Sequence, residues 1–278
     1  MSPSVAYNRR LLSSMQTFLL ALMLVAVTAS ADTITKTVEY THDGTKFEGY
    51  LAYDSSATPD AKRPGILVIP EWWGLNDYIK SRADQLAAMG YIAFAADMYG
   101  NGTNTLDPKQ AGQLAGSLHN SPEMPARAQA ALDQLQKTGL VDPARLAAIG
   151  FCFGGTTCQS LAFSGAHIAG IVSFHGGLIQ PTPDDLTAIH CKFLILNGGI
   201  DPTVKSDAIA SYLKALDSAH IDYQFVNYAG ALHAFTNPDA TKIAEQNGMT
   251  GTIGYNEPAA RRSWQQMQVF FNEIFGQK

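Results

Sequence analysis

The sequence has few cysteines and no excess of charge of one sign. Only three of its 278 residues are cysteines, at positions 152, 158 and 191, and the formal net charge is −5. Disulfide-stapled secreted domains are shorter and carry more, evenly paired cysteines, so the chain does not belong to that class. A nucleic-acid-binding protein normally has a basic face. No basic run of that kind is present, and we expect no nucleic-acid partner.

Several other signals are missing as well. There is no H-E-x-x-H, no C-x-x-C and no glycine-rich dinucleotide fingerprint, so we expect neither a metal nor an organic cofactor. Internal repeats, low-complexity segments and linkers are also missing. With 46% hydrophobic and 15% charged residues, the composition suits one globular domain with a full core.

The N-terminus differs from the rest of the chain. Arg9 and Arg10 precede the apolar run 18–27 and the Ala29-Ser30-Ala31 site, which are the three parts of a secretory signal peptide. The run is about half of the roughly 20 residues that span a bilayer. We predict a signal peptide over residues 1–31, cleaved after Ala31, and a secreted or periplasmic protein without stable membrane insertion after cleavage. An N-terminal membrane anchor is the alternative.

Residues 32–278 alternate between short apolar runs and amphipathic stretches, which predicts an α/β fold in one domain. The expected strands are 34–40, 46–53, 65–70, 91–95, 145–150, 167–174, 193–197 and 223–227. Helices are expected from the Asn76 cap to about residue 90, within 108–136, over 153–163 and 207–216, and from Asn256 onward. We therefore predict a mostly parallel sheet with helices on both faces and an antiparallel N-terminal edge.

One motif points to nucleophilic catalysis. Residues 150–154 read G-x-C-x-G with Cys152 at the centre, between an expected strand and an expected helix. This is the setting of a nucleophile elbow, a turn so tight that its flanking residues must be small. A helix N-terminus behind the thiol favours a thiolate and offers N–H groups to an oxyanion. The alternative is an inert structural cysteine, which we expect for Cys158 and Cys191.

The partners of such a nucleophile follow it in the order acid, then histidine, in loops after later strands. Asp201 follows the expected strand 193–197, and His233 follows 223–227. We therefore predict Asp201 as the orienting acid and His233 as the base. His175 also follows a strand but precedes Asp201, so we place it near the site without a catalytic role.

A carboxylate lies in the loop after the first buried strand. Glu71 stands beside Trp72 and Trp73 at the end of an apolar run. A carboxylate is costly to bury unless it is paired. Either Glu71 belongs to the active site beside Cys152, or it lies at the rim of that site and points into solvent.

These residues together resemble the dienelactone hydrolase family. The resemblance rests on P-E-W-W-G at 70–74, A-A-D-M-Y-G at 95–100, G-F-C-F-G-G at 150–155, G-G-I-D at 198–201 and A-L-H-A-F at 231–235. It implies an α/β-hydrolase that opens esters or lactones without a cofactor, with Cys152, Asp201 and His233 as the triad. It also implies that Glu71 helps to form the thiolate, and that the N–H groups of Phe153 and Trp72 form the oxyanion hole. Members of the family carry arginines that bind a substrate carboxylate, one of them shortly after the histidine. Here neither residues 234–237, directly after His233, nor residues 95–105, around Tyr99, include an arginine.

We therefore predict a monomeric hydrolase that cleaves a small ester or lactone through an acyl group on Cys152. Trp73, Phe151 and His175 are candidate substrate-binding residues. Two alternatives stay open from the sequence. The first is a non-catalytic scaffold that binds a hydrophobic ligand between Trp72, Trp73 and Phe151, and the second is an acyltransferase that excludes water. The polar, glycine-containing segment 236–255 is either a lid or a surface excursion.

Overall fold

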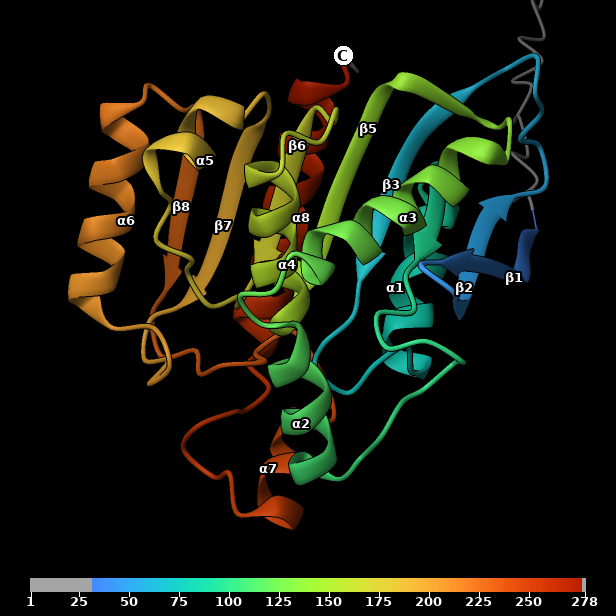
Figure 1. The fold of residues 1–278 in the computed structure, drawn as a ribbon. Coiled ribbons are helices and arrows are strands. Elements are labelled where there is room, and N and C mark those ends of the chain that lie inside the picture. Colours follow the sequence, from blue (N-terminus) through green and yellow to red (C-terminus); the bar gives the residue numbers. More distant parts are fainter. Residues whose placement is uncertain (1–31, 277–278) are drawn as a thin grey trace, which may run out of the picture. The chain divides into compact units, whose positions relative to one another are not determined.

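A sheet of eight strands organises the fold (Figure 1). The structure is a computed structural model, and it describes residues 32–276. The predicted signal peptide, residues 1–31, lies outside the described residues. The described residues, 32–276, fall within one compact unit. Within this range no helix is long and apolar enough to cross a membrane.

The strand order is β1-β2-β4-β3-β5-β6-β7-β8. β1 pairs antiparallel with β2, and β2 with β4, whereas all the other neighbours are parallel. This confirms the mostly parallel sheet with an antiparallel N-terminal edge. The strands are β1 (Thr33–His42), β2 (Thr45–Asp54), β3 (Arg63–Ile69), β4 (Ile92–Ala95), β5 (Val141–Phe151), β6 (Gly170–Phe174), β7 (Lys192–Gly198) and β8 (Tyr223–Tyr228).

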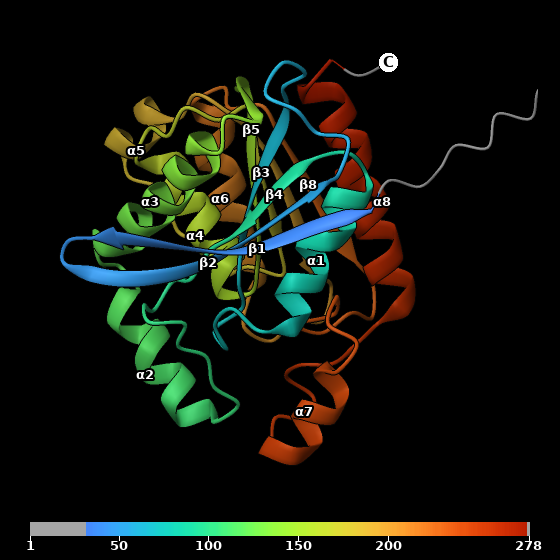
Figure 2. The same cartoon turned by 90° about the vertical axis from the view of Figure 1, so that its right-hand side faces the viewer.

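Helices cover both faces of the sheet (Figure 2). They are α1 (Asp77–Ala88), α2 (Pro108–Leu118), α3 (Glu123–Lys137), α4 (Phe153–Phe163), α5 (Pro183–Ala188), α6 (Ser206–Ser218), α7 (Ala240–Asn247) and α8 (Glu257–Ile274). One core lies under α3, α4 and α6, and the other under α1 and α8. Because apolar strands buried on both faces need two such cores, the sequence of β3 to β7 dictates this three-layer arrangement.

Helix boundaries follow local capping chemistry. The Asn76 side chain accepts from the Ile79 N–H at 3.2 Å, and the Asn256 side chain accepts from the Ala259 N–H at 3.1 Å, as expected of N-cap residues. The predicted helical stretch 108–136 divides into α2 and α3. The backbone leaves α2 at His119, which is extended, and Asn120 has a positive φ of 58°. Pro122 favours the break as well, because it lacks an N–H and disfavours helical geometry at the preceding residue.

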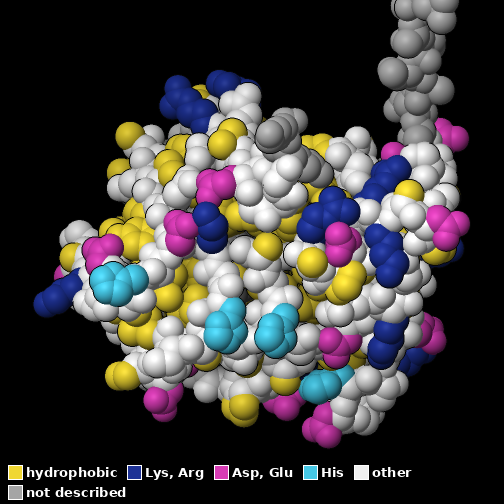
Figure 3. All heavy atoms as spheres, turned by 90° about the horizontal axis from the view of Figure 1, so that it is seen from above, with side chains coloured by type: hydrophobic (Ala, Val, Ile, Leu, Met, Phe, Trp, Pro, Cys, Tyr) yellow, Lys and Arg dark blue, Asp and Glu magenta, His cyan; other side chains and the backbone are white. Residues whose placement is uncertain are grey.

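The helices α2 and α7 stand apart from the two covering layers. Both lie beyond the end of the sheet at which the parallel strands finish (Figure 1). The loops that follow β3, β5, β7 and β8 meet at this end, which is where ligands bind in open α/β sheets. The opposite end carries basic and acidic side chains scattered among hydrophobic ones (Figure 3).

Candidate active site

Cys152 occupies a strained turn between β5 and α4. Its φ is 53° and its ψ is −116°, a sparsely populated region that costs a non-glycine residue on the order of 1–3 kcal/mol. The flanking glycines make this turn sterically possible. A Cβ on Gly150 would collide with the Gly154 carbonyl, and one on Gly154 would collide with the Ile69 carbonyl. The tight turn predicted from G-x-C-x-G is therefore present.

The loops after β7 and β8 bring an acid and a histidine together. His233 Nδ1 lies 2.7 Å from Asp201 Oδ2. The other oxygen, Oδ1, accepts from the Thr203 hydroxyl at 2.7 Å and the Thr203 N–H at 2.8 Å, so the carboxylate is held on both sides. His233 and Cys152 line the same cavity. The structure thus unites the three residues that the sequence placed in separate loops.

The electrostatics of the pair favour a charged histidine. Burial opposes ionisation of Asp201, but its hydrogen bond with His233 and the positive charge there outweigh this effect and lower the pKa of Asp201. Burial also opposes the imidazolium of His233. The negative charge of a Cys152 thiolate and the hydrogen bond to Asp201 nevertheless raise the pKa of His233 well above its usual value. His233 is therefore suited to accept a proton within this site.

Glu71 is buried at the end of β3, with only 1% of its surface exposed, which excludes the rim position. The Asn237 side-chain amide donates to Glu71 Oε2 at 2.8 Å. Burial raises the pKa of Glu71 to about 7, against the lowering effects of the Asn237 hydrogen bond and of the positive charges on His233 and Arg82. Because this pKa lies near neutrality, the carboxyl can both accept and return a proton at physiological pH.

Two backbone N–H groups near Cys152 have no hydrogen-bond acceptor among the described residues and could bind an oxyanion. In the described part of the chain, neither the N–H of Trp72 nor that of Phe153 donates a hydrogen bond to another group. Phe153 opens α4, where the first N–H groups have no partner within the helix. The Tyr99 hydroxyl donates to the Trp72 carbonyl at 2.8 Å, which fixes the peptide that follows Trp72. Both predicted donors are thus free to bind an oxyanion.

His175 lies behind the nucleophile and not on the cavity wall. It is fully buried, and its Nδ1 accepts from the Cys152 N–H at 3.1 Å. Its Nε2 lies 2.7 Å from the Thr236 hydroxyl. Burial lowers the pKa of His175 well below its usual value, and the charges of His233 and Arg82 lower it further. His175 therefore lies near the site, where we placed it, but it is buried and does not line the cavity.

Phe151, the other candidate for the ligand site, does not line the cavity either. Alternate side chains of a strand point to opposite faces of the sheet, and Phe151 points into the core under α1 and α8 with no exposed surface. Its ring stacks on Phe174 with centroids 4.8 Å apart. Phe151 therefore stabilises the elbow strand from the interior.

The cavity above Cys152 has a volume of about 200 Å³. Its lining includes Glu71, Trp72 and Trp73, as expected, and also residues that the sequence did not indicate, namely Thr203, Ala234, Met249, Thr252 and Ile253. The last three follow α7, so part of the segment 236–255 forms a wall of the cavity. A hydrogen bond ties this wall to the catalytic loop, because the N–H of His233 donates to the Thr252 carbonyl at 3.2 Å.

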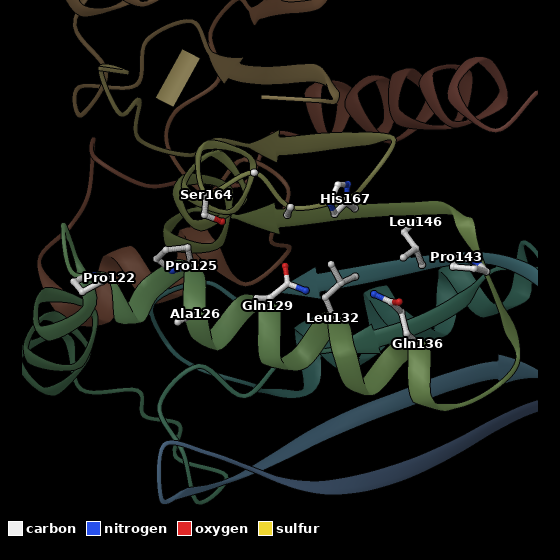
Figure 4. A pocket seen from close by; sticks show the side chains of 12 residues that line it. Pro122, Pro125, Ala126, Gln129, Leu132, Gln136, Pro143, Leu146, Ser164 and His167 are labelled. Atoms are coloured by element: carbon white, nitrogen blue, oxygen red, sulfur yellow. The ribbon is translucent and has the colours of Figure 1, made fainter. Parts of the chain in front are cut away.

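A larger hollow, of about 680 Å³, lies between α3 and the loop that follows α4 (Figure 4). The described residues that line it are mostly apolar, with two glutamines, Ser164 and a single ionisable residue, His167. The hollow therefore lacks the acid and base partners that catalysis needs. Across residues 32–276 no group of three or more His, Cys, Asp or Glu side chains is placed to hold a metal ion. The small cavity at Cys152 is therefore the candidate active site.

Comparison with known proteins shows the family of this chain. The dienelactone hydrolase family profile matches residues 47–275. An Aquifex aeolicus protein provisionally named carboxymethylenebutenolidase is 29% identical over 72% of this chain and 86% of its own length. The solved structure named m3DLH has 39% identity and a TM-score of 0.81, covering 87% of this chain and 98% of its own. P91, described as a dienelactone hydrolase-like promiscuous phosphotriesterase from metagenomic libraries, has 36% identity, the same TM-score and the same coverage.

Proposed function

This chain belongs to the dienelactone hydrolase family and is an ester or lactone hydrolase, and we propose that it acts through a thioester on Cys152. One observation carries the proposal. A cysteine in a strained elbow and a hydrogen-bonded His233–Asp201 pair line one small cavity. A nucleophile, a base and an orienting acid in this relation are the parts of a catalytic triad.

The first half of the proposed reaction is acylation. The thiol proton of Cys152 passes to the Glu71 carboxylate, and the thiolate attacks the ester carbonyl. The N–H groups of Trp72 and Phe153 hold the oxyanion that forms. When this intermediate collapses, the carbon–oxygen bond to the alcohol breaks, and the alkoxide takes the proton back from Glu71. A thioester and a free alcohol result, and the Glu71 carboxylate is restored.

The second half is hydrolysis of the thioester. His233 takes a proton from a water molecule as the water attacks the thioester carbonyl, and Asp201 stabilises the imidazolium that forms. Collapse of the second intermediate releases the acid and the Cys152 thiolate, which recovers its proton from His233. Between turnovers the cysteine is a thiol. This state resists oxidation in the secreted or periplasmic setting that we propose for the protein.

Family membership favours this reaction over a non-catalytic scaffold. An acyltransferase would share the acylation half and replace water with another acceptor. The two are separated by the yield of free acid when an alcohol is added to the assay. A hydrolase releases free acid in proportion to the ester consumed.

We expect Glu71→Gln to slow acylation by about 10²-fold or more, since general-base catalysis typically contributes 10²–10⁴-fold. The wild-type acylation rate should fall as the pH drops through about 7, where Glu71 takes up a proton, and the variant should lose this dependence. The rate of the nitrophenol burst from p-nitrophenyl acetate in stopped flow measures acylation separately from deacylation.

The matched control is Glu257→Gln, which makes the same change on an exposed side chain at the start of α8. Because burial raises the folded-state pKa of Glu71 to about 7, its carboxylate destabilises the fold increasingly as the pH rises above the usual carboxyl range, and fully above about pH 7. The glutamine variant should therefore be at least as stable there as the wild type, so unfolding would not explain a slow burst. A wild-type burst rate in Glu71→Gln would remove Glu71 from the mechanism.

A further inference from the structure

In the described part of the chain, no lysine or arginine contributes to the wall of the active-site cavity. Ten residues line it, and none of them is lysine or arginine. The ionisable members are Glu71, Cys152 and His233, of which two become anions when they lose a proton. The rest of the wall is mainly apolar, with both tryptophans, Ala234, Met249 and Ile253. The cavity wall therefore combines groups that can become anions with an apolar surface.

Arg82 is a cation whose charge reaches Glu71, but its guanidinium is held behind the site. The guanidinium carbon lies 5.1 Å from the Tyr78 ring centroid and 4.9 Å from that of Trp264. Its Nη2 donates to the Thr236 carbonyl at 2.7 Å, and its Nη1 donates to Gln85 at 2.9 Å. Arg82 does not line the cavity, so it offers no N–H to a substrate.

The hydrogen-bond partner of Glu71 is a neutral side chain, Asn237. Asn237 donates a single amide hydrogen bond to Oε2, and both residues are almost fully buried. His233 cannot serve as a counter-ion for a substrate either. Its charge is already balanced by Asp201 at 2.7 Å, and its free nitrogen is needed for the water of deacylation. Among residues 32–276, the cavity wall therefore has no positive group left to neutralise a bound anion.

On the basis of the proposed thioester mechanism, we infer that the enzyme's substrates are small esters or lactones without negative charge, and that a free carboxylate on the substrate impairs reaction. Such a carboxylate would leave water for an apolar wall without a partner. It would also repel the Glu71 carboxylate and the attacking thiolate at short range in a medium of low dielectric constant. The charge of the substrate, and not only its size, therefore sets specificity.

Two acetate esters of matched shape test this inference. The alcohol part of para-carboxyphenyl acetate is an anion, whereas that of para-carbamoylphenyl acetate is neutral and nearly isosteric. Both deliver the same acetyl group to Cys152, so only acylation senses the charge. We expect kcat/KM for the neutral ester to exceed that for the anion by about tenfold or more, after each is divided by its rate with a simple thiol.

A variant pair tests the electrostatic cause. Met249 lies on the cavity wall and is partly exposed, so a longer side chain can be accommodated there. Met249→Arg adds a cation, and Met249→Gln is the neutral control of similar length. The ratio of the two kcat/KM values should shift toward the carboxylate ester by about tenfold in Met249→Arg and should stay near the wild-type ratio in Met249→Gln.

Equal normalised kcat/KM values in the wild type would overturn the inference, while activity on both esters would leave the proposed hydrolase function intact. The inference would also be wrong if Met249→Arg and Met249→Gln gave the same ratio. Failure to hydrolyse either ester would instead contradict the proposed function itself.

Discussion

Cys152→Ala is expected to lower kcat/KM for small activated esters by about 10³-fold or more, to the level left by binding and the oxyanion donors alone. Alanine retains the Cβ of the elbow residue but has no atom that can attack the carbonyl. The assay is steady-state release of nitrophenol from p-nitrophenyl acetate by freshly purified enzyme. Circular dichroism and Tm should match the wild type, because Cys152 is partly exposed and alanine can adopt the same backbone turn.

The same substitution at another cysteine is the control. Cys158 lies in α4 with no exposed surface, and burial raises the pKa of its thiol well above the usual value. Cys158→Ala should keep wild-type activity, since a buried, protonated thiol is inert. Substantial residual activity in Cys152→Ala, after contaminating esterases are excluded, would mean that another group is the nucleophile.

His233→Ala should lower kcat by about 10³-fold. It removes the base for deacylation, the hydrogen bond to Asp201 and the positive charge that stabilises the thiolate. Because the triad acts as a unit, the double variant Cys152→Ala/His233→Ala should be no less active than either single variant. Kinetics of all three variants on one ester form the test.

His119→Ala, at an exposed position after α2, is the matched control and should leave the kinetics unchanged. Multiplicative losses in the double variant would show that Cys152 and His233 act independently, contrary to the mechanism. Near-normal activity of His233→Ala would also contradict it. His175 is not placed to take over, because it is buried and hydrogen-bonded at both ring nitrogens.

Local sequence signals were enough to predict the elbow and its partners. G-x-C-x-G dictates a turn that only small flanking residues permit, and the structure has that turn at Cys152. Asp201 and His233 were found because parallel strands end at the same edge of a sheet. The antiparallel edge was predictable from the two expected strands 34–40 and 46–53, which are separated by only a short turn and pair as β1 and β2. Each of these features depends on residues that are close in sequence or on a general rule of topology.

Features that depend on distant contacts were not predictable in the same way. The sequence left open whether Glu71 is buried, because its partner Asn237 lies 166 residues away. The bonds of His175 to the Cys152 N–H and to Thr236 arise from the pairing of β6 with β5 and from the loop after β8. The wall formed by Met249, Thr252 and Ile253 follows a helix of eight residues, too short to stand out from its polar surroundings.

The thioester on Cys152 is the central claim, and intact-mass spectrometry of an acid-quenched reaction tests it most directly. During the burst with p-nitrophenyl acetate, we predict a population of enzyme heavier by one acetyl group. Digestion should place this group on the peptide that contains Cys152, and hydroxylamine should remove it. The Cys152→Ala variant should form no such adduct. An acetyl group on a different residue, or a burst of nitrophenol without any adduct, would contradict the mechanism.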